Sequence, residues 1–357
     1  MRRIARIGVI LALLVPTAAY AECSTLIPVD VQSSIQARVD SGINAGIVVG
    51  VIAACGNSFY GYGSMTDSGD TSVDEHTLFE IGSATKPFTA LLLAEAVEQG
   101  ELSLYDEIDD FLPATVSPPR LGPRSIQLQQ LATHTSGLPP IPENLDPVDW
   151  NNPYADYTVE QLYEFISDYR VYGLGSYTYS NLGMGLLGHI LELHFGASYE
   201  SLVIERIANV LGMQDTRVTL TDEQIQRTAT GYREGEAFPI WANPTLAGAG
   251  CLLSTASDLA TFVAANLGLL DSPLLAAMQM THQERIPGNM PVGLAWHMRK
   301  TEGKTIVEHH GATGGCWSYI GFVIEDQMGV VVLTNTYADV DDIGIHILDS
   351  AIPLSMP

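Results

Sequence analysis

The chain has 357 residues, with 41 acidic against 16 basic side chains and a formal net charge of −25 at pH 7. This acidic balance argues against nucleic acid and anionic membranes as partners, because both carry negative charge themselves. The length allows one large domain or two closely associated ones.

The first 21 residues are typical of a cleaved signal peptide. The basic segment MRRIAR precedes the apolar run IGVILALLV, and Ala-Tyr-Ala at 19–21 fits a small-residue cleavage site. The run is shorter than the ~20 residues that a membrane span needs, and Glu22 before Cys23 argues against a lipoprotein cleavage there. We therefore expect an exported protein, periplasmic or secreted, without a stable membrane anchor.

The predicted elements place strands near both ends of the chain and helices between them. A short helix is expected at 31–42, and a Val/Ile-rich run at 45–54 followed by 59–62 predicts a hairpin. After residue 285, strand patterns recur in VGLAWHM, TIVEHH, SYIGFVI and GVVVLTN, before a last helix at 339–351. Helical patterns fill the middle, starting at Ser83 and recurring at 126–131, 158–168, 181–195, 198–212 and 254–268.

This order predicts an α/β fold: an antiparallel sheet made from both ends of the chain, flanked by helices, with an inserted all-helical subdomain. We assign residues 22–82 and 251–357 to the sheet domain. Residues 83–250 form the mostly helical subdomain, with irregular specificity loops at 138–160 and 215–250.

Four cysteines, an even number in an exported chain, predict disulfides. Of the three possible pairings we expect Cys23 with Cys55 and Cys251 with Cys316; the alternative is four buried thiols. Neither C-x-x-C nor H-E-x-x-H occurs in the sequence, so it gives no support for a zinc site, and no cofactor is expected.

The segment FEIGSATKPFTALLLAEAVEQG, residues 79–100, carries the first indication of chemistry. Ser83 and Lys86 are three residues apart, so a helix that begins near Ser83 places both side chains on one face. Lys86 is one of only three lysines and lies in an apolar helix, where loss of water lowers the pKa of the amine. A neutral amine beside a hydroxyl can activate a serine nucleophile, although this short motif alone is weak.

Two further stretches strengthen this interpretation. In YTYSNLGMG, Tyr179 and Asn181 lie where a turn leads into a helix. By themselves they would be read as turn and cap residues. The stretch VEHHGATGGCWSYIGF predicts a strand with small residues, where a backbone can approach a substrate closely.

Together these stretches resemble the serine β-lactamase and penicillin-binding-protein superfamily, in particular its branch of class C β-lactamases, D,D-carboxypeptidases and family VIII esterases. The order S-x-x-K, Y-x-N and a K-T-G-like strand matches, and LATHTSGLP, GMQDTRV and STASDLATF extend the likeness over nearly the whole mature chain. The resemblance implies that Ser83 is the acyl-forming nucleophile, Lys86 its general-base partner and Tyr179 a second acid/base group. It also implies that Asn181 hydrogen-bonds a substrate amide, and that the backbone N–H groups of Ser83 and Ala312 form the oxyanion hole.

The third motif departs from the family pattern. Aligning GATGG places His309, His310 and Gly311 over Lys-Thr-Gly, so His309 replaces a cation that favours a substrate carboxylate. Histidine carries less charge than lysine near neutral pH, since its ordinary pKa is about 6.5. Adjacent histidines on a strand point to opposite faces, and we expect His309 to face the site, whereas His134 is expected to order a loop.

The sequence therefore predicts an exported, metal-independent serine hydrolase that forms and hydrolyses an acyl-enzyme on a small-molecule substrate. The favoured substrate is a β-lactam or a D,D-peptide-like amide. A carboxylesterase of short acyl esters and a penicillin-binding receptor that is acylated without turnover remain open. A catalytically inactive binding homologue is a further alternative. The presence of Ser83, Lys86 and Tyr179 together argues against it. No oligomeric state is predicted.

Overall fold

The computed structural model describes residues 26–66, 69 and 71–355. The predicted signal peptide at 1–21 and Cys23 lie outside these ranges. Within them, no helix combines the length and the apolar character that crossing a membrane requires.

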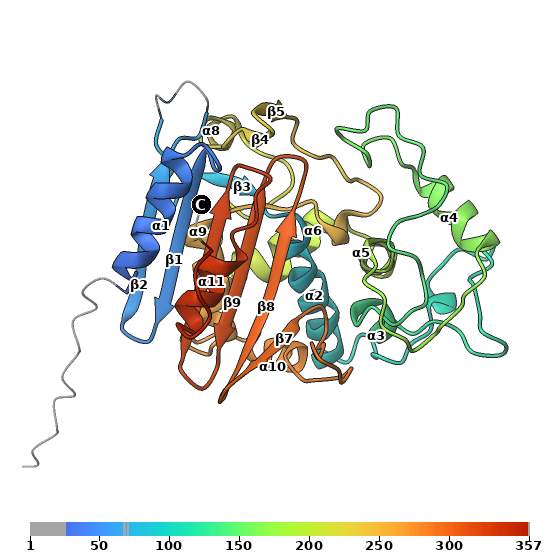
Figure 1. The fold of residues 1–357 in the computed structure, drawn as a ribbon. Helices are drawn as coiled ribbons and strands as arrows, with labels where there is room; N and C mark the ends of the chain where they lie inside the picture. The colour runs from blue at the N-terminus through green and yellow to red at the C-terminus, as the bar shows by residue number, and fades with distance from the viewer. Residues whose placement is uncertain (1–25, 67–68, 70, 356–357) are drawn as a thin grey trace, which may run out of the picture.

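The centre of the protein is a six-stranded antiparallel sheet with strand order β2-β1-β10-β9-β8-β7 (Figure 1). Both ends of the chain meet in it, because β1 pairs with β10, with Val49 opposite Val332. This confirms the predicted α/β fold. The strands are β1 (Gly46–Ala53), β2 (Gly56–Gly63), β7 (His297–Thr301), β8 (Lys304–Ala312), β9 (Trp317–Val323) and β10 (Met328–Thr334).

The two faces of this sheet bury different cores. On β1, Val49 and Val51 pack against α1 and α11, which lie together on one face in Figure 1, whereas Val48 and Ile52 belong to the larger core on the opposite face. Because both faces are covered, β1 and β10 consist of nearly continuous Val and Ile runs rather than an alternating pattern. The covering helices are α1 (Val29–Asp40), α11 (Asp341–Leu348) and, on the opposite face, α9 (Ala256–Asn266).

The helical part begins with α2 and continues beyond the edge of the sheet formed by β7 and β8 (Figure 1). Helix α2 is buried along most of its length and packs against α5 and α10. An almost uniformly apolar helix of this kind is stable only inside a core. These helices are α2 (Lys86–Glu98), α3 (Leu128–Ala132), α4 (Val159–Asp168), α5 (Asn181–Phe195), α6 (Tyr199–Val203) and α10 (Leu275–Thr281).

The helix at 181–195 matches its predicted bounds, and α9 begins after Thr255, whose hydroxyl accepts the Asp258 N–H at 3.1 Å. Other segments differ. The predicted helix at 198–212 is divided into α6, a π-helical turn (Ile204–Ala208) and α7 (Asn209–Leu211). The segment 215–250, expected to be irregular, contains α8 (Asp222–Gln226) and a hairpin of β4 (Gly231–Arg233) and β5 (Glu236–Phe238).

Two more expectations near the C-terminus need correction. The segment VGLAWHM is not one strand, because Ala295 has a φ of +64°, which breaks an extended backbone, and β7 begins only at His297. Helix α10 was not predicted at all, since its seven residues are too few to show a helical period.

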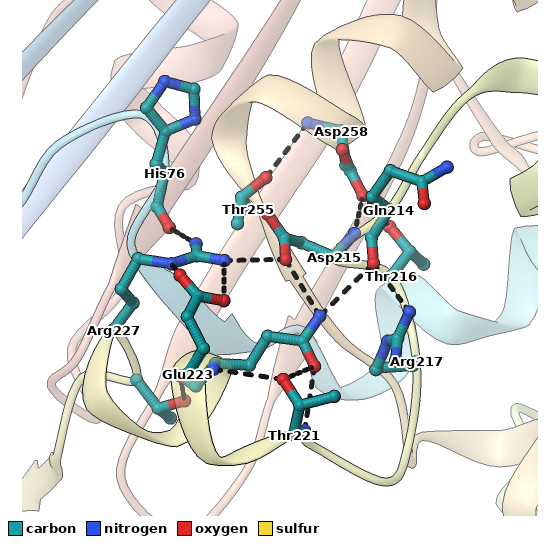
Figure 2. A network of polar contacts seen from close by, with 12 residues as sticks. His76, Gln214, Asp215, Thr216, Arg217, Thr221, Glu223, Arg227, Thr255 and Asp258 are labelled. Atoms are coloured by element: carbon teal, nitrogen blue, oxygen red, sulfur yellow. Dashed lines mark hydrogen bonds and ion pairs between the residues drawn. The ribbon is translucent and has the colours of Figure 1, made fainter.

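A polar network centred on Arg227 fastens the α8 segment to the core beneath it (Figure 2). The guanidinium contacts Asp215 Oδ1 at 2.8 Å and Glu223 Oε1 at 2.6 Å, and donates to the carbonyl oxygen of His76. The carboxylate of Asp258 accepts the Asp215 N–H at 2.8 Å. The network therefore joins α8 to the start of α9 and to the chain just before β3.

Strand β3 (Leu78–Glu80) leads directly to Ser83, and it is held from both sides. It pairs with β6 (Leu253–Thr255), and the Leu78 N–H donates to the Arg227 carbonyl at 2.9 Å. The network of Figure 2 thus fixes the segment that precedes the predicted nucleophile.

The predicted disulfide between Cys251 and Cys316 is wrong, because both residues are buried free thiols. Cys251 belongs to the same core cluster as Tyr199, whereas Cys316 lies between β8 and β9, where its N–H donates to Thr313 Oγ1 at 3.3 Å. Each thiol fills a separate buried position, and burial raises the pKa of both. The pairing of Cys23 with Cys55 stays a prediction.

Candidate active site

Ser83 lies in a 3₁₀ turn (Gly82–Thr85) that leads directly into α2. The turn packs against the end of β8 at two glycines. Gly82 has a φ of +47°, and a Cβ there would lie 2.6 Å from the carbonyl oxygen of Ala312. A Cβ on Gly311 would lie 2.7 Å from the Ser83 nitrogen. Without these two glycines, the backbone of Ser83 could not approach Gly311 and Ala312 this closely.

Lys86 begins α2 one turn after Ser83. Its Nζ lies 2.7 Å from Ser83 Oγ and donates to the Ala249 carbonyl at 2.7 Å. The side chain has no exposed surface, and this burial lowers the pKa of the amine well below its ordinary value. The amine can therefore be neutral near neutral pH, with a lone pair available for the serine proton.

Tyr179 lies beside both Ser83 and Lys86, in the loop that precedes α5. Its hydroxyl hydrogen-bonds the Ser83 side chain, and Lys86 Nζ lies 4.9 Å from its ring centroid. Burial raises the pKa of this phenol above its ordinary value, so it holds its proton. Ser180 fixes the loop, since its Oγ caps α5 by accepting the Gly183 N–H at 2.9 Å and donates to the Pro139 carbonyl at 2.6 Å.

Asn181, the first residue of α5, lies on the side of Ser83 that faces Tyr154. Its side chain hydrogen-bonds the Tyr154 hydroxyl, and its N–H donates to the Pro140 carbonyl at 2.9 Å. Its Oδ1 is buried and has no hydrogen-bond partner among the described residues. A buried acceptor of this kind is costly unless a ligand satisfies it.

His309 lies beside the site as a neutral ring. Its Nδ1 is 2.6 Å from the His310 carbonyl, which assigns the ring proton to Nδ1 and leaves Nε2 as an acceptor. That Nε2 is buried and unpartnered within the described part of the chain. Burial, followed by the nearby His297 and Lys86, lowers the pKa of His309 well below its ordinary value. His309 is therefore not a fixed cation at neutral pH.

His310 lines the same recess as Ser83 and His309, and it pairs with Asp341, with Nδ1 and Oδ2 2.8 Å apart. This hydrogen bond raises the pKa of His310. Of the two histidines of the motif, His310 thus has the surroundings that favour a charged ring, whereas burial disfavours it at His309.

Two histidines that the sequence analysis did not place in the site pack around Tyr179. The ring centroid of His134 lies 4.5 Å from that of Tyr179, and its Nδ1 accepts the Ser180 N–H at 3.2 Å. His297 of β7 is 2.9 Å from the Tyr177 hydroxyl, and its ring lies 5.3 Å from that of His309.

Burial is the main cause that lowers the pKa of both histidines, to about 4 for His297 and well below its ordinary value for His134. Among the described residues, no three His, Cys, Asp or Glu side chains are arranged to hold a metal ion. The sequence contained no signal for His297, which the pairing of β7 with β8 places opposite Glu308 and beside the ring of His309.

Ser83 lies where two recesses meet. The larger recess holds about 490 Å³, and its lining includes Tyr179, His309, Trp317 of β9 and Tyr337. The smaller holds about 40 Å³ and is lined on one side by Asn181, Tyr154 and Trp241. A further hollow of about 590 Å³ lies on the surface of α4 and contains none of the predicted site residues.

The Beta-lactamase family model matches residues 31–349. The chain belongs to this family. A beta-lactamase of Pseudomonas fluorescens is 27% identical over 345 residues, which cover 85% of this chain and 92% of the relative. The D-alanyl-D-alanine-carboxypeptidase/endopeptidase AmpH of Escherichia coli (strain K12) is 28% identical over 295 residues, covering 77% and 75%.

Solved structures of the beta-lactamase family share the fold. A class C beta-lactamase from Rhodobacter sphaeroides superposes with a TM-score of 0.79 at 25% identity, covering 90% of this chain and 99% of that one. A Beta-Lactamase/D-Alanine Carboxypeptidase from Pseudomonas syringae gives 0.79 at 27% identity, covering 90% and 98%. These likenesses confirm the predicted family, the fold and the reaction class, which is serine hydrolysis of the β-lactamase or D,D-peptidase type.

Proposed function

We propose that this protein is a periplasmic or secreted enzyme in which Ser83 forms an acyl-enzyme with a β-lactam or with a D,D-peptide-like amide. The observation that carries the proposal is the 2.7 Å contact between Ser83 Oγ and the fully buried Lys86 Nζ. The signal-like N-terminal sequence, which lies outside the described residues, supports the location.

In the acylation step, the neutral amine of Lys86 takes the proton from Ser83 Oγ as the oxygen attacks the substrate carbonyl carbon. The carbonyl oxygen becomes an oxyanion, which the backbone N–H groups of Ser83 and Ala312 stabilise. Tyr179 gives its phenolic proton to the departing nitrogen as the C–N bond breaks. The proton on Lys86 then returns to the tyrosine.

Deacylation runs the same proton transfers in reverse order. Water attacks the acyl carbon and loses its proton to the basic member of the Lys86–Tyr179 pair. Ser83 Oγ recovers a proton from this pair as the acid product leaves. Asn181 is proposed to hydrogen-bond a polar group on the acyl part, such as an amide or amine N–H. His309 is proposed to face the leaving part as a neutral hydrogen-bond acceptor, and Gly311 to give the substrate access to the strand.

Turnover of nitrocefin and of p-nitrophenyl butyrate, measured side by side on the mature protein and on Ser83→Ala, tests the proposal. Nitrocefin hydrolysis that depends on Ser83 supports β-lactam turnover. Ester turnover alone indicates the carboxylesterase alternative, and a stable acyl adduct without turnover indicates the receptor. Equal activity of Ser83→Ala and the unsubstituted protein would contradict the proposal.

A further inference from the structure

The two recesses beside Ser83 differ about twelvefold in volume, with about 40 Å³ on the Asn181 side and about 490 Å³ on the His309 side. A water-sized group occupies roughly 10–15 Å³ on this measure. The smaller recess therefore has room for only a small group, whereas the larger one has room for a ring system.

The small recess is narrow because two loops, far apart in the sequence, close over it. Tyr154 and Trp241 both line it, with ring centroids 5.8 Å apart in an edge-to-face arrangement. Trp241 Nε1 donates to the Asn151 carbonyl at 2.8 Å. The Asn152 side chain accepts the Ala242 N–H at 2.9 Å. These bonds join the two loops into a single wall.

This wall is also fastened to the strands on both sides of Ser83. The backbone N–H of Trp241 donates to Glu80 Oε1 at 2.8 Å. Thr313 Oγ1 donates to the second oxygen of the same carboxyl group at 3.2 Å. Glu80 ends β3, and Thr313 directly follows β8. A Cβ on Gly314 would lie 2.9 Å from Trp241 Nε1, so the indole is packed tightly against this segment. The wall cannot widen without breaking these contacts.

We propose that Tyr154 and Trp241 limit the acyl part of the substrate to small groups, while a bulky leaving part occupies the His309 side. The preferred substrates are then short acyl derivatives, or β-lactams without a large side chain. This inference rests on the proposed function, because it places the acyl part on the Asn181 side of Ser83.

The test compares kcat/KM for p-nitrophenyl acetate and p-nitrophenyl hexanoate, and acylation rates for 6-aminopenicillanic acid and benzylpenicillin. The unsubstituted protein should favour the small member of each pair at least tenfold. Trp241→Ala and Tyr154→Ala should each reduce this preference to less than threefold, mainly by raising kcat/KM for the bulky substrate. Should Trp241→Ala not fold, Tyr154→Ala carries the same expectation.

Two control variants distinguish the steric effect of the aromatic rings that fill the recess from other effects of substitutions in these loops. Tyr154→Phe keeps the ring and removes the hydroxyl that bonds Asn181, so it should retain the size preference. Ile240→Ala changes an exposed side chain on the same loop that does not line the recess, and should leave both rates unchanged.

Equal rates for small and bulky substrates in the unsubstituted protein would overturn the inference, as would a preference that survives both alanine variants. Those outcomes leave the proposed function intact as long as mass spectrometry finds the acyl group on Ser83. Failure of every substrate to acylate Ser83 would instead contradict the proposed function itself, and the inference with it.

Discussion

Lys86 Nζ lies 2.7 Å from Ser83 Oγ, and the lysine side chain that makes this contact has no exposed surface. The pair is local in sequence, since both residues belong to one turn at the start of α2. Its chemistry is not local, because the burial that lowers the pKa of the amine comes from the core around α2.

Replacing Ser83 by alanine should reduce kcat by several orders of magnitude, because it removes the covalent nucleophile. A fluorescent penicillin or a fluorophosphonate should label the unsubstituted protein, with the adduct mapped to Ser83 by mass spectrometry. Ser33→Ala, on the exposed face of α1, should behave as the unsubstituted protein does. An adduct on another serine would show that the nucleophile is misassigned.

Lys86→Arg should lower kcat/KM at least a hundredfold at every pH, since arginine remains charged and cannot accept the serine proton. In the unsubstituted protein, activity should be present above the depressed pKa of Lys86 and fall as the pH drops through it, when the amine becomes protonated. A pH–rate profile measures this. Lys300→Arg, at an exposed position paired with Glu284, is the matched control. Retained activity in Lys86→Arg would rule out the general-base role.

His309 should remain neutral between pH 6 and 8, because burial lowers its pKa well below the ordinary value. KM for the anionic 6-aminopenicillanic acid should therefore not change across this range through titration of His309. His309→Lys should raise kcat/KM for this anion about tenfold relative to a neutral ester, which corresponds to about 1–2 kcal/mol for one partly screened charge pair. His309→Gln, which adds no charge, is the comparison. No gain with lysine would show that residue 309 does not face the carboxylate.

Glu80 should make the protein less stable as the pH rises through neutrality. Burial raises the pKa of this carboxyl group from 4.5 to about 7. The folded state thus binds a proton more tightly than the unfolded one. The free energy of unfolding should therefore be highest below pH 4.5 and fall by about 3 kcal/mol as the pH rises through about 7.

Glu80→Gln resembles the protonated form of this carboxyl group and should remove much of the loss of stability. Denaturant unfolding at pH 5 and pH 8 measures the effect, with Glu98→Gln on the exposed end of α2 as the control. An identical pH dependence in Glu80→Gln and the unsubstituted protein would mean that Glu80 titrates normally.

Unreduced protein, unfolded in denaturant and alkylated, should show two modified cysteines, Cys251 and Cys316. Both are buried thiols in the folded protein and become accessible only on unfolding. Peptide mapping identifies the sites. Four modified cysteines would contradict the predicted pairing of Cys23 with Cys55, and none would contradict the free thiols.

Sequence patterns predicted the parts of the molecule that depend on local order. The helix at 181–195 has an N-cap, an apolar period and a C-terminal glycine, and all of these signals lie within the helix and its two flanking residues. The central strands β1 and β10 contain apolar runs rich in Val, which can be recognised without knowledge of their partners.

Other features depend on contacts between distant residues and could not be predicted in this way. Trp241 and Tyr154 lie about ninety positions apart in the sequence, and neither loop has a pattern that identifies the other as its partner. The neutral state of His309 follows from burial and from His297, which enters the site only through the register of β7. The predicted pairing of Cys251 with Cys316 failed for the same reason, since an even number of cysteines says nothing about the distances between them.

The close packing of the Ser83 turn against Gly311 also bears on when the protein becomes reactive. Ser83 and Lys86 are synthesised early, but their backbone partner on β8 belongs to the last sixth of the chain. That strand is held between β7 and β9, and β10 closes the sheet against β1. Such long-range pairing forms late in folding. A nascent or truncated chain would therefore carry its serine without the backbone partner that β8 supplies.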